Sequence, residues 1–178
     1  MSEDTTPRLA RLRARFELLD ANGDGRLQAD DFRLLVDRVA DALTVDGESA
    51  KVRALAHGCR VYWDGLAGTA DSDRDNTVTF DEYVAALPDA DHFDSYGRPY
   101  ARALAALADR DDDGYIEQGD FLATMTAIGF SRSRAVELFA ALSRDDRVAT
   151  AVWETAIRDY YVNASADIPG QVLAPQSA

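Results

Sequence analysis

Apolar residues recur at steps of three and four along most of the chain, which is the spacing of one face of an α-helix. The first run, Leu9, Leu12, Phe16 and Leu19, follows a threonine–proline pair of the kind that starts helices. Polar segments with glycine or proline separate the later runs. We predict helices over about residues 7–19, 32–43, 49–67, 80–87, 99–107, 121–128, 131–139 and 153–161.

Three acidic segments share one spacing of oxygen-bearing side chains. They are loop one (Asp20–Asp31), loop two (Asp71–Glu82) and loop three (Asp109–Asp120). Each carries such side chains at positions 1, 3, 5, 9 and 12, and an aliphatic residue at position 8. Position 6, which favours a left-handed backbone, is glycine in loops one and three and Asn76 in loop two. This is the pattern of an EF-hand calcium loop, and three such loops between amphipathic helices predict calcium binding.

The predicted ligands are side-chain oxygens, together with the backbone carbonyl at position 7 of each loop. In loop one they are Asp20, Asn22, Asp24, the Arg26 carbonyl, Gln28 through a water molecule, and Asp31. In loop two they are Asp71, Asp73, Asp75, the Thr77 carbonyl, Thr79 and Glu82. In loop three they are Asp109, Asp111, Asp113, the Tyr115 carbonyl, Glu117 and Asp120. We therefore expect about three Ca²⁺ ions for each chain.

Position 12 differs among the loops, and the difference bears on which metal binds. Glu82 is the one glutamate at this position and is the best candidate for binding Ca²⁺ with both oxygens. Asp31 and Asp120 are one methylene shorter, and a lower coordination number suits octahedral Mg²⁺. We expect Mg²⁺ to compete with Ca²⁺ at sites one and three. The alternative is that the following helix moves closer and the aspartate still binds with both oxygens.

A fourth helix–loop–helix unit near the C-terminus lacks the acidic ligands. With Val148 at position 8, positions 1, 3, 5 and 12 hold Ala141, Ser143, Asp145 and Val152. A second register starts the loop at Ser143 and makes it two residues shorter, because Phe139 and Leu142 then match the apolar spacing that precedes loop one. Both registers place Val152 where the essential acid belongs. We expect no metal in this unit and a structural role in pairing with loop three.

The four units predict an all-α fold with two paired lobes packed into one compact globule. The aliphatic residues at position 8 should form short β-ladders, with Leu27 opposite Val78 and Ile116 opposite Val148. We predict an N-terminal EF-hand pair at 7–88, a linker at 89–98, a C-terminal pair at 99–163 and an irregular tail at 164–178.

Composition narrows the partners and the compartment. With 178 residues, 47% of them hydrophobic, the chain can bury a substantial core. Its 32 acidic and 19 basic residues give a formal net charge of −13, which disfavours nucleic acid and anionic membranes. Cys59 is the single cysteine, and the N-terminus has no signal-peptide pattern. No apolar run is long enough to span a bilayer. We expect a cytoplasmic monomer.

The histidine and cysteine residues of the chain do not indicate a catalytic site. His57 and His92 are the only histidines, and Cys59 lies two positions from His57. Residues two apart on a helix do not share a face, so a cysteine–histidine nucleophile pair is not expected. We predict no enzyme activity.

Four helix–loop–helix units, one of them silent, resemble the sarcoplasmic calcium-binding protein and calerythrin group over about residues 7–163. The resemblance implies a compact helical globule that buffers Ca²⁺ and Mg²⁺ or modulates a signal. The chain has only two methionines, whereas sensors such as calmodulin open a methionine-rich groove. We favour a buffer, with a calcium sensor that regulates a target protein as the alternative.

Photoproteins related to this group enclose a small apolar ligand. The residues of this chain that could line such a cavity are His57, Tyr62, Trp63, Trp153 and Tyr160. Large aromatic side chains at helical spacing usually fill a core, and we prefer that interpretation.

Overall fold

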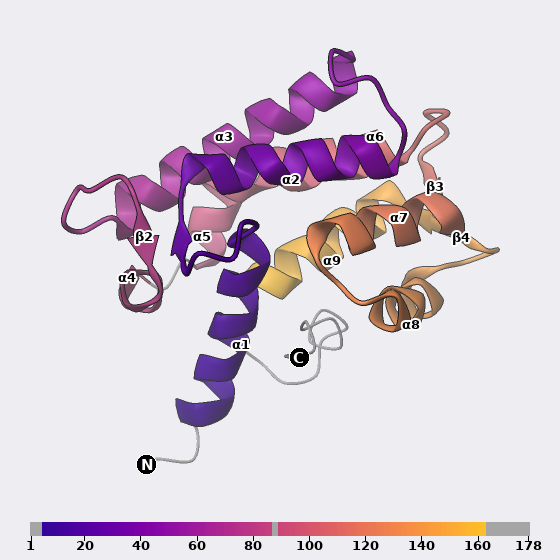
Figure 1. The fold of residues 1–178 in the computed structure, drawn as a ribbon. Coiled ribbons are helices and arrows are strands. Elements are labelled where there is room, and N and C mark those ends of the chain that lie inside the picture. Colours follow the sequence, from indigo (N-terminus) through magenta and orange to yellow (C-terminus); the bar gives the residue numbers. More distant parts are fainter. Residues whose placement is uncertain (1–4, 87–88, 163–178) are drawn as a thin grey trace.

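The computed structural model describes residues 5–86 and 89–162 (Figure 1). The predicted tail at 164–178 and the predicted helix end at Pro88 lie outside these residues. The described part is mostly helical with two short antiparallel sheets, as predicted. In chain order its elements are α1 (Thr5–Leu19), β1 (Arg26–Leu27), α2 (Ala29–Ala42), α3 (Ala50–Ala70), β2 (Val78–Thr79), α4 (Phe80–Ala86), α5 (Ala90–His92), the π-helix η1 (Phe93–Gly97), α6 (Arg98–Ala108), β3 (Tyr115–Glu117), α7 (Gln118–Ile128), α8 (Arg132–Leu142), β4 (Arg147–Ala149) and α9 (Thr150–Val162).

Several helix boundaries follow from single residues that the sequence identifies. Ser49 and Ser131 precede α3 and α8, and each hydroxyl accepts a hydrogen bond of 3.3 Å from the backbone N–H three residues on. Pro99 lies in the first turn of α6. Gly129 ends α7 with φ of 127°, a conformation that a side chain would disfavour. These four predicted boundaries are confirmed.

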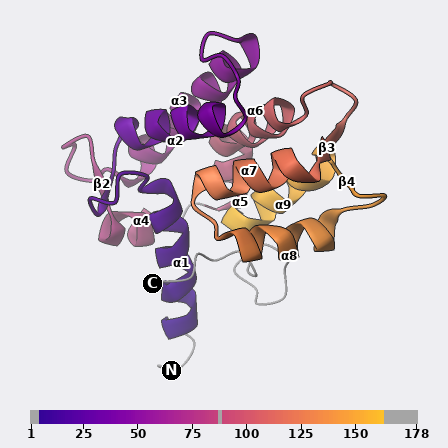
Figure 2. The ribbon, with the colours of Figure 1, turned by 45° about the vertical axis from the view of Figure 1, so that its right-hand side comes forward.

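The two β-ladders have the predicted register. β1 and β2 pair antiparallel with Leu27 opposite Val78, and β3 and β4 pair with Ile116 opposite Val148. All four aliphatic side chains are fully buried. Figures 1 and 2 show the ladders on opposite sides of the molecule, so each one joins a different pair of loops.

Helix α3 is the element on which the two halves meet. It packs against α2 and α4 of its own half, against η1 of the connecting segment and against α6 of the other half. Two glycines permit the close approach. A Cβ at Gly65 would lie 2.1 Å from Cγ of Tyr96, and one at Gly58 would lie 2.8 Å from the backbone of Pro99. Helix α2 also contacts α7, so a single core runs through both halves.

The segment predicted as a linker is helical. The Asp89 carboxylate accepts a hydrogen bond from the His92 N–H at 2.9 Å and caps α5, which runs directly into η1 and α6. The guanidinium of Arg158 on α9 donates to both oxygens of Asp94 on η1, at 2.7 and 3.0 Å. This bidentate ion pair ties the connection to the C-terminal half.

Tyr62, Trp153 and Tyr160 are buried in the core, as preferred from the sequence. Tyr62 packs against Phe93, Tyr100 and Tyr161, with ring centroids 5.8–6.0 Å apart. The cavity beside Trp153 holds only about 30 Å³. Ligand pockets are usually hundreds of cubic ångströms in volume, so this cavity does not suit a bound small molecule.

Within the described ranges, no helix combines the length and the apolar character that a bilayer span requires.

Candidate metal centres

Loop one is closed by hydrogen bonds from its own backbone to its acidic side chains. The Asp20 carboxylate accepts bonds from the N–H groups of Gly23, Asp24 and Gly25 at 2.8–3.1 Å. Asp31, at position 12, is fully buried and accepts bonds from the Asn22 N–H at 3.1 Å and the Gln28 N–H at 2.8 Å. Burial raises the pKa of Asp31. A bound cation would favour the ionised form and offset that burial.

The polar side chains of loop one are also joined to one another. The amides of Asn22 and Gln28 donate to Oδ2 of Asp24 at 3.3 and 2.8 Å. The side chain of Arg26 points instead toward loop two, where its Nη1 lies 3.7 Å from Oδ2 of Asp75. Its backbone carbonyl is the predicted ligand. Three of the predicted side-chain ligands of loop one, Asn22, Asp24 and Gln28, are thus joined to one another.

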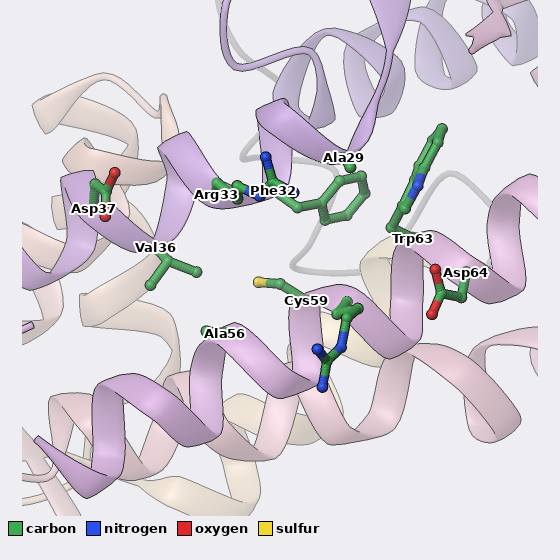
Figure 3. Close-up of a pocket in the computed structure, with 10 residues that line it drawn as sticks. Ala29, Phe32, Arg33, Val36, Asp37, Ala56, Cys59, Trp63 and Asp64 are labelled. Carbon is green, nitrogen blue, oxygen red and sulfur yellow. The ribbon is translucent and has the colours of Figure 1, made fainter. Parts of the chain in front are cut away.

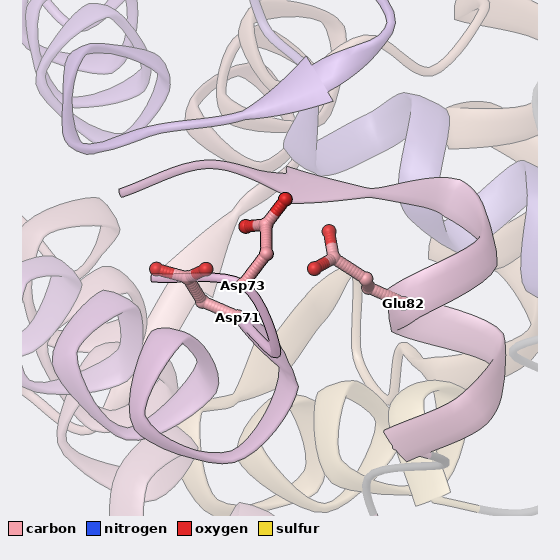
Figure 4. Close-up of side chains that lie close together, drawn as sticks. All are labelled: Asp71, Asp73 and Glu82. Carbon is pink, nitrogen blue, oxygen red and sulfur yellow. The ribbon is translucent and has the colours of Figure 1, made fainter. Parts of the chain in front are cut away.

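Loop two brings three predicted ligands together most clearly. Oxygens of Asp71, Asp73 and Glu82 lie within 4.8 Å of one another (Figure 4). Glu82 accepts hydrogen bonds from the backbone N–H groups of Ser72 at 3.1 Å and Thr79 at 2.8 Å. The N–H of Thr79 and the hydroxyls around Glu82 lower its pKa to about 2, so the carboxylate is ionised at neutral pH.

Two further ligands of loop two take part in this network. The hydroxyl of Thr79 donates to Oε2 of Glu82 at 2.9 Å. Oδ1 of Asp75 accepts from both the N–H and the hydroxyl of Thr77, at 2.8 and 2.7 Å, which lowers the pKa of Asp75. Desolvation, with smaller effects from the charges of Asp75 and Glu82, raises the pKa of Asp73. Packed, partly desolvated carboxylates of this kind are stabilised by a hard divalent cation.

Loop three gathers only part of its predicted ligand set. Oxygens of Asp109, Asp111 and Asp113 lie within 4.8 Å of one another. Glu117 is exposed on β3 outside this group. Asp120, at position 12, pairs with Nη1 of Arg110 at 3.4 Å. Loop three therefore differs from loops one and two, in which the acid at position 12 accepts the N–H of position 9.

The loop backbones carry left-handed residues at two positions. At position 6, Gly25, Asn76 and Gly114 have φ of 84°, 64° and 85°, as expected. Position 4 is also left-handed, at Gly23, Arg74 and Asp112, with φ of 73°, 62° and 59°. The left-handed backbone at position 4 was not predicted, because arginine and aspartate do not signal this conformation as glycine does.

Basic side chains lie among the acidic ligands, and the sequence analysis did not identify them. Nη1 of Arg147, on β4, lies 3.1 Å from Oδ2 of Asp113. Nζ of Lys51, on α3, lies 2.7 Å from Asp112 and donates to the Asp109 carbonyl at 2.5 Å. With Arg26 and Arg110, these residues partly neutralise loops that hold many carboxylates.

The structure decides between the two registers of the silent loop. Helix α8 ends at Leu142, and Ser143 follows as its C-cap, as Asp109 follows α6. The chain then reaches Val148 in six residues from the helix end, whereas α6 and Ile116 are eight residues apart. The shorter register, with the loop starting at Ser143, is the one adopted. Asp145 and Asp146 form a turn with φ of 51° and 60°.

The chemistry of these sites suits Ca²⁺. Ca²⁺ takes about 6–8 oxygen ligands at about 2.3–2.6 Å and tolerates varied geometry. Loops two and three are the places in the described chain where three carboxylates converge, and both supply hard oxygen donors. Loop one supplies fewer carboxylates and more amide oxygens from Asn22 and Gln28. The residues present therefore fit the metal that the loop pattern predicts.

Comparison with known proteins supports the same conclusion. A family model described as EF hand matches residues 12–36, which contain loop one. Calerythrin from Saccharopolyspora erythraea is 26% identical over 159 residues, covering 85% of this chain and 90% of calerythrin. A solved calcium-binding protein from Streptomyces coelicolor, described in terms of prokaryotic calcium-mediated regulation, is 32% identical with a TM-score of 0.78, covering 88% of this chain and 98% of that one.

The fold extends to more distant proteins. A sarcoplasmic calcium-binding protein from amphioxus is 15% identical with a TM-score of 0.70, and the match covers 96% of this chain and 98% of that one. At this identity the likeness shows a shared fold.

Proposed function

The chain belongs to the EF-hand calcium-binding proteins of the calerythrin group, and we propose that it binds three Ca²⁺ ions through loops one, two and three. The ligands are the eighteen residues that the sequence analysis names for these loops. The observation that carries the proposal is the convergence of Asp71, Asp73 and Glu82. Three carboxylates within 4.8 Å repel one another, and a bound cation would stabilise them. The silent fourth loop binds none.

We further propose that the protein acts as a cytoplasmic calcium buffer or modulator that closes on its ions. It works as a monomer of two EF-hand pairs, 7–88 and 99–163, and has no catalytic role. The packed aromatic core supports this reading, because Tyr62, Phe93, Tyr100 and Tyr161 interlock across both halves. Opening a groove would break these contacts.

We also propose that Mg²⁺ competes with Ca²⁺ at sites one and three, where the aspartates at position 12 are held by different partners. Asp31 is buried and already bonded to two loop N–H groups, so its short side chain is held in a fixed position. Asp120 is held by Arg110 and must leave it to bind a metal. Glutamate is one methylene longer and reaches an ion more readily with both oxygens, so Asp120→Glu should favour Ca²⁺ over Mg²⁺ at loop three. Unchanged selectivity in metal competition titrations would discard the argument from position 12.

One feature favours the alternative of a sensor that regulates a target protein. A cavity of about 550 Å³ lies between α2 and α3. Figure 3 shows Phe32 and Val36 of α2 facing Cys59 and Trp63 of α3 across it, with charged residues at its rim. An apolar helix of a partner could bind such a groove. The Streptomyces coelicolor relative is described in terms of calcium-mediated regulation, which points in the same direction.

Binding of a hydrophobic-surface dye separates the two functions. Metal-free protein is titrated with Ca²⁺ in millimolar Mg²⁺ while dye fluorescence is followed. A low or falling signal means that the protein closes on its ions and supports the buffer. A rising signal means that Ca²⁺ exposes an apolar surface, and it would replace the buffer with the sensor. The Trp63→Ala variant tests whether a rising signal comes from the groove between α2 and α3.

A further inference from the structure

Each loop pair contains an arginine that reaches across the β-ladder to a predicted metal ligand. In the C-terminal pair, Nη1 of Arg147 lies 3.1 Å from Oδ2 of Asp113. In the N-terminal pair, Nη1 of Arg26 lies 3.7 Å from Oδ2 of Asp75. Both arginines precede the buried aliphatic residue of their strand, and both aspartates occupy position 5 of the partner loop. The contact therefore recurs at equivalent places.

The ladder register explains this placement. Arg147 lies opposite Glu117, and Arg26 lies opposite Thr79, so each arginine faces position 9 of the partner loop. In both aspartates, Oδ1 accepts the backbone N–H of its own loop two residues on, at 2.8 and 2.9 Å. Oδ2 is then directed toward the arginine. The guanidinium of Arg147 also lies 4.5 Å from the centroid of the Tyr115 ring, which helps to hold it in place.

The reciprocal contact does not occur in either pair. Position 7 of loop two is Thr77, and position 7 of loop three is Tyr115, neither of which carries a charge. Oδ2 of Asp24, the equivalent oxygen in loop one, instead accepts the amide of Gln28 at 2.8 Å. In each pair a single loop therefore receives a cation from its partner. In the C-terminal pair the donor is the loop that lacks metal ligands of its own.

We propose that Arg147 sets the calcium affinity of loop three, and that this is a function of the silent loop. The inference rests on the proposed function, in which loop three binds an ion. Without metal, the guanidinium offsets the mutual repulsion of Asp109, Asp111 and Asp113. When Ca²⁺ binds, the guanidinium and the ion carry like charges around one carboxylate, so Arg147 lowers the affinity. Arg26 acts on loop two in the same way, but more weakly because its contact is longer.

The test compares three variants of the full-length protein by NMR. Arg147→Gln removes the charge, and Arg147→Lys keeps it. Arg144→Gln removes an equal charge from the same loop at a residue with no ion pair in the described chain. The backbone amide of Gly114 reports loop three, since its N–H donates to Asp109 at 2.9 Å. The amide of Gly25 reports loop one in the same spectra, because it bonds Asp20 at 2.8 Å.

Arg147→Gln should tighten Ca²⁺ binding to loop three, followed at the Gly114 amide, by about three- to tenfold. This is the size expected for one partly exposed charge next to the ion. The Ca²⁺ affinity of loop one, followed at the Gly25 amide, should not change. The gain in affinity at loop three should shrink in high salt. Arg147→Lys should stay near wild type, and Arg144→Gln should show a clearly smaller gain than Arg147→Gln.

Unchanged or weaker binding in Arg147→Gln, or an equal gain in Arg144→Gln, would overturn the role of Arg147. The response of the wild-type protein tests the proposed function itself. If the Gly114 amide of wild-type protein does not respond to Ca²⁺ at all, loop three binds no ion. The two failures are therefore distinguishable within one experiment.

Discussion

The N-terminal and C-terminal loop pairs each contain a β-ladder, and they differ in how many of their loops carry the acids of a calcium loop. Loops one and two both carry acids at positions 1 and 12, whereas the fourth loop has Ser143 at its start and Val152 at the final position. Yet Leu27, Val78, Ile116 and Val148 are all fully buried. Pairing of the strands is thus set by aliphatic packing and backbone hydrogen bonds, which do not require a metal ligand in both loops.

The fourth unit has the architecture of an EF-hand without the acidic ligands. It retains the entering helix α8, the strand β4 and the exiting helix α9. Its Trp153 is buried against Phe121, with ring centroids 5.0 Å apart. The unit contains residues that complete the core of its partner and lacks the acids at the first and last loop positions.

Removal of a ligand from an active loop should give the largest effect. Asp71→Ala takes away the position 1 carboxylate, which lies with Asp73 and Glu82 and accepts the N–H of Asn76 at 3.0 Å. Calorimetric titration should show two bound Ca²⁺ ions in place of three. The matched control is Asp145→Ala in the silent loop, which should leave the count at three. Unchanged stoichiometry in Asp71→Ala would remove loop two from the assignment.

The two ladders should contribute similarly to stability in metal-free protein. Ile116→Ala and Leu27→Ala each empty a fully buried site and should lower the free energy of unfolding by about 2–5 kcal/mol. Urea denaturation in the presence of a chelator measures the free energy of unfolding of both variants. If Ile116→Ala has almost no effect while Leu27→Ala is strongly destabilising, the fourth loop does not have the structural role assigned to it.

The interface between the two halves can be tested on helix α3. A methyl group at Gly65 would collide with the Tyr96 ring, so Gly65→Ala should destabilise the protein by about 1–3 kcal/mol. Gly68→Ala is the control, since nothing lies within 4 Å of a Cβ there. It should be neutral or stabilising by up to about 1 kcal/mol. Equal effects of the two substitutions in thermal unfolding would contradict the close packing of η1 on α3.

Restoring one acid to the silent loop should have the smallest effect. Val152→Glu supplies an acid at the final position, but Ser143 still occupies the start of the loop, which remains two residues short. The number of Ca²⁺ ions should stay at three, as measured by calorimetry. A fourth ion would mean that the length of this loop does not prevent binding.

Features that depend on local spacing were predictable from the sequence. Aliphatic residues at position 8 predicted the pairs Leu27–Val78 and Ile116–Val148, because ladder register follows from loop position. The helix ranges predicted from apolar spacing also place helix ends next to Ser49, Gly129 and Ser131, as the structure does. The acidic spacing predicted the convergence of carboxylates in loops two and three.

Features that depend on distant partners were not predictable from the sequence. Gly58 and Gly65 weaken the helix signal of α3, and their purpose is visible only beside Pro99 and Tyr96. The π-helix η1 likewise depends on packing against α3 and on the ion pair to α9. The reach of Arg147 to Asp113 follows from the ladder register, which places side chains from two loops side by side.

Native mass spectrometry of the wild-type protein at saturating Ca²⁺ tests the central claim most directly. Loops one, two and three are each assigned one ion and the fourth loop none, so the fully loaded protein should carry three Ca²⁺ ions. Two ions would mean that one of the active loops is misassigned. Four ions would contradict the conclusion that the fourth loop binds no metal.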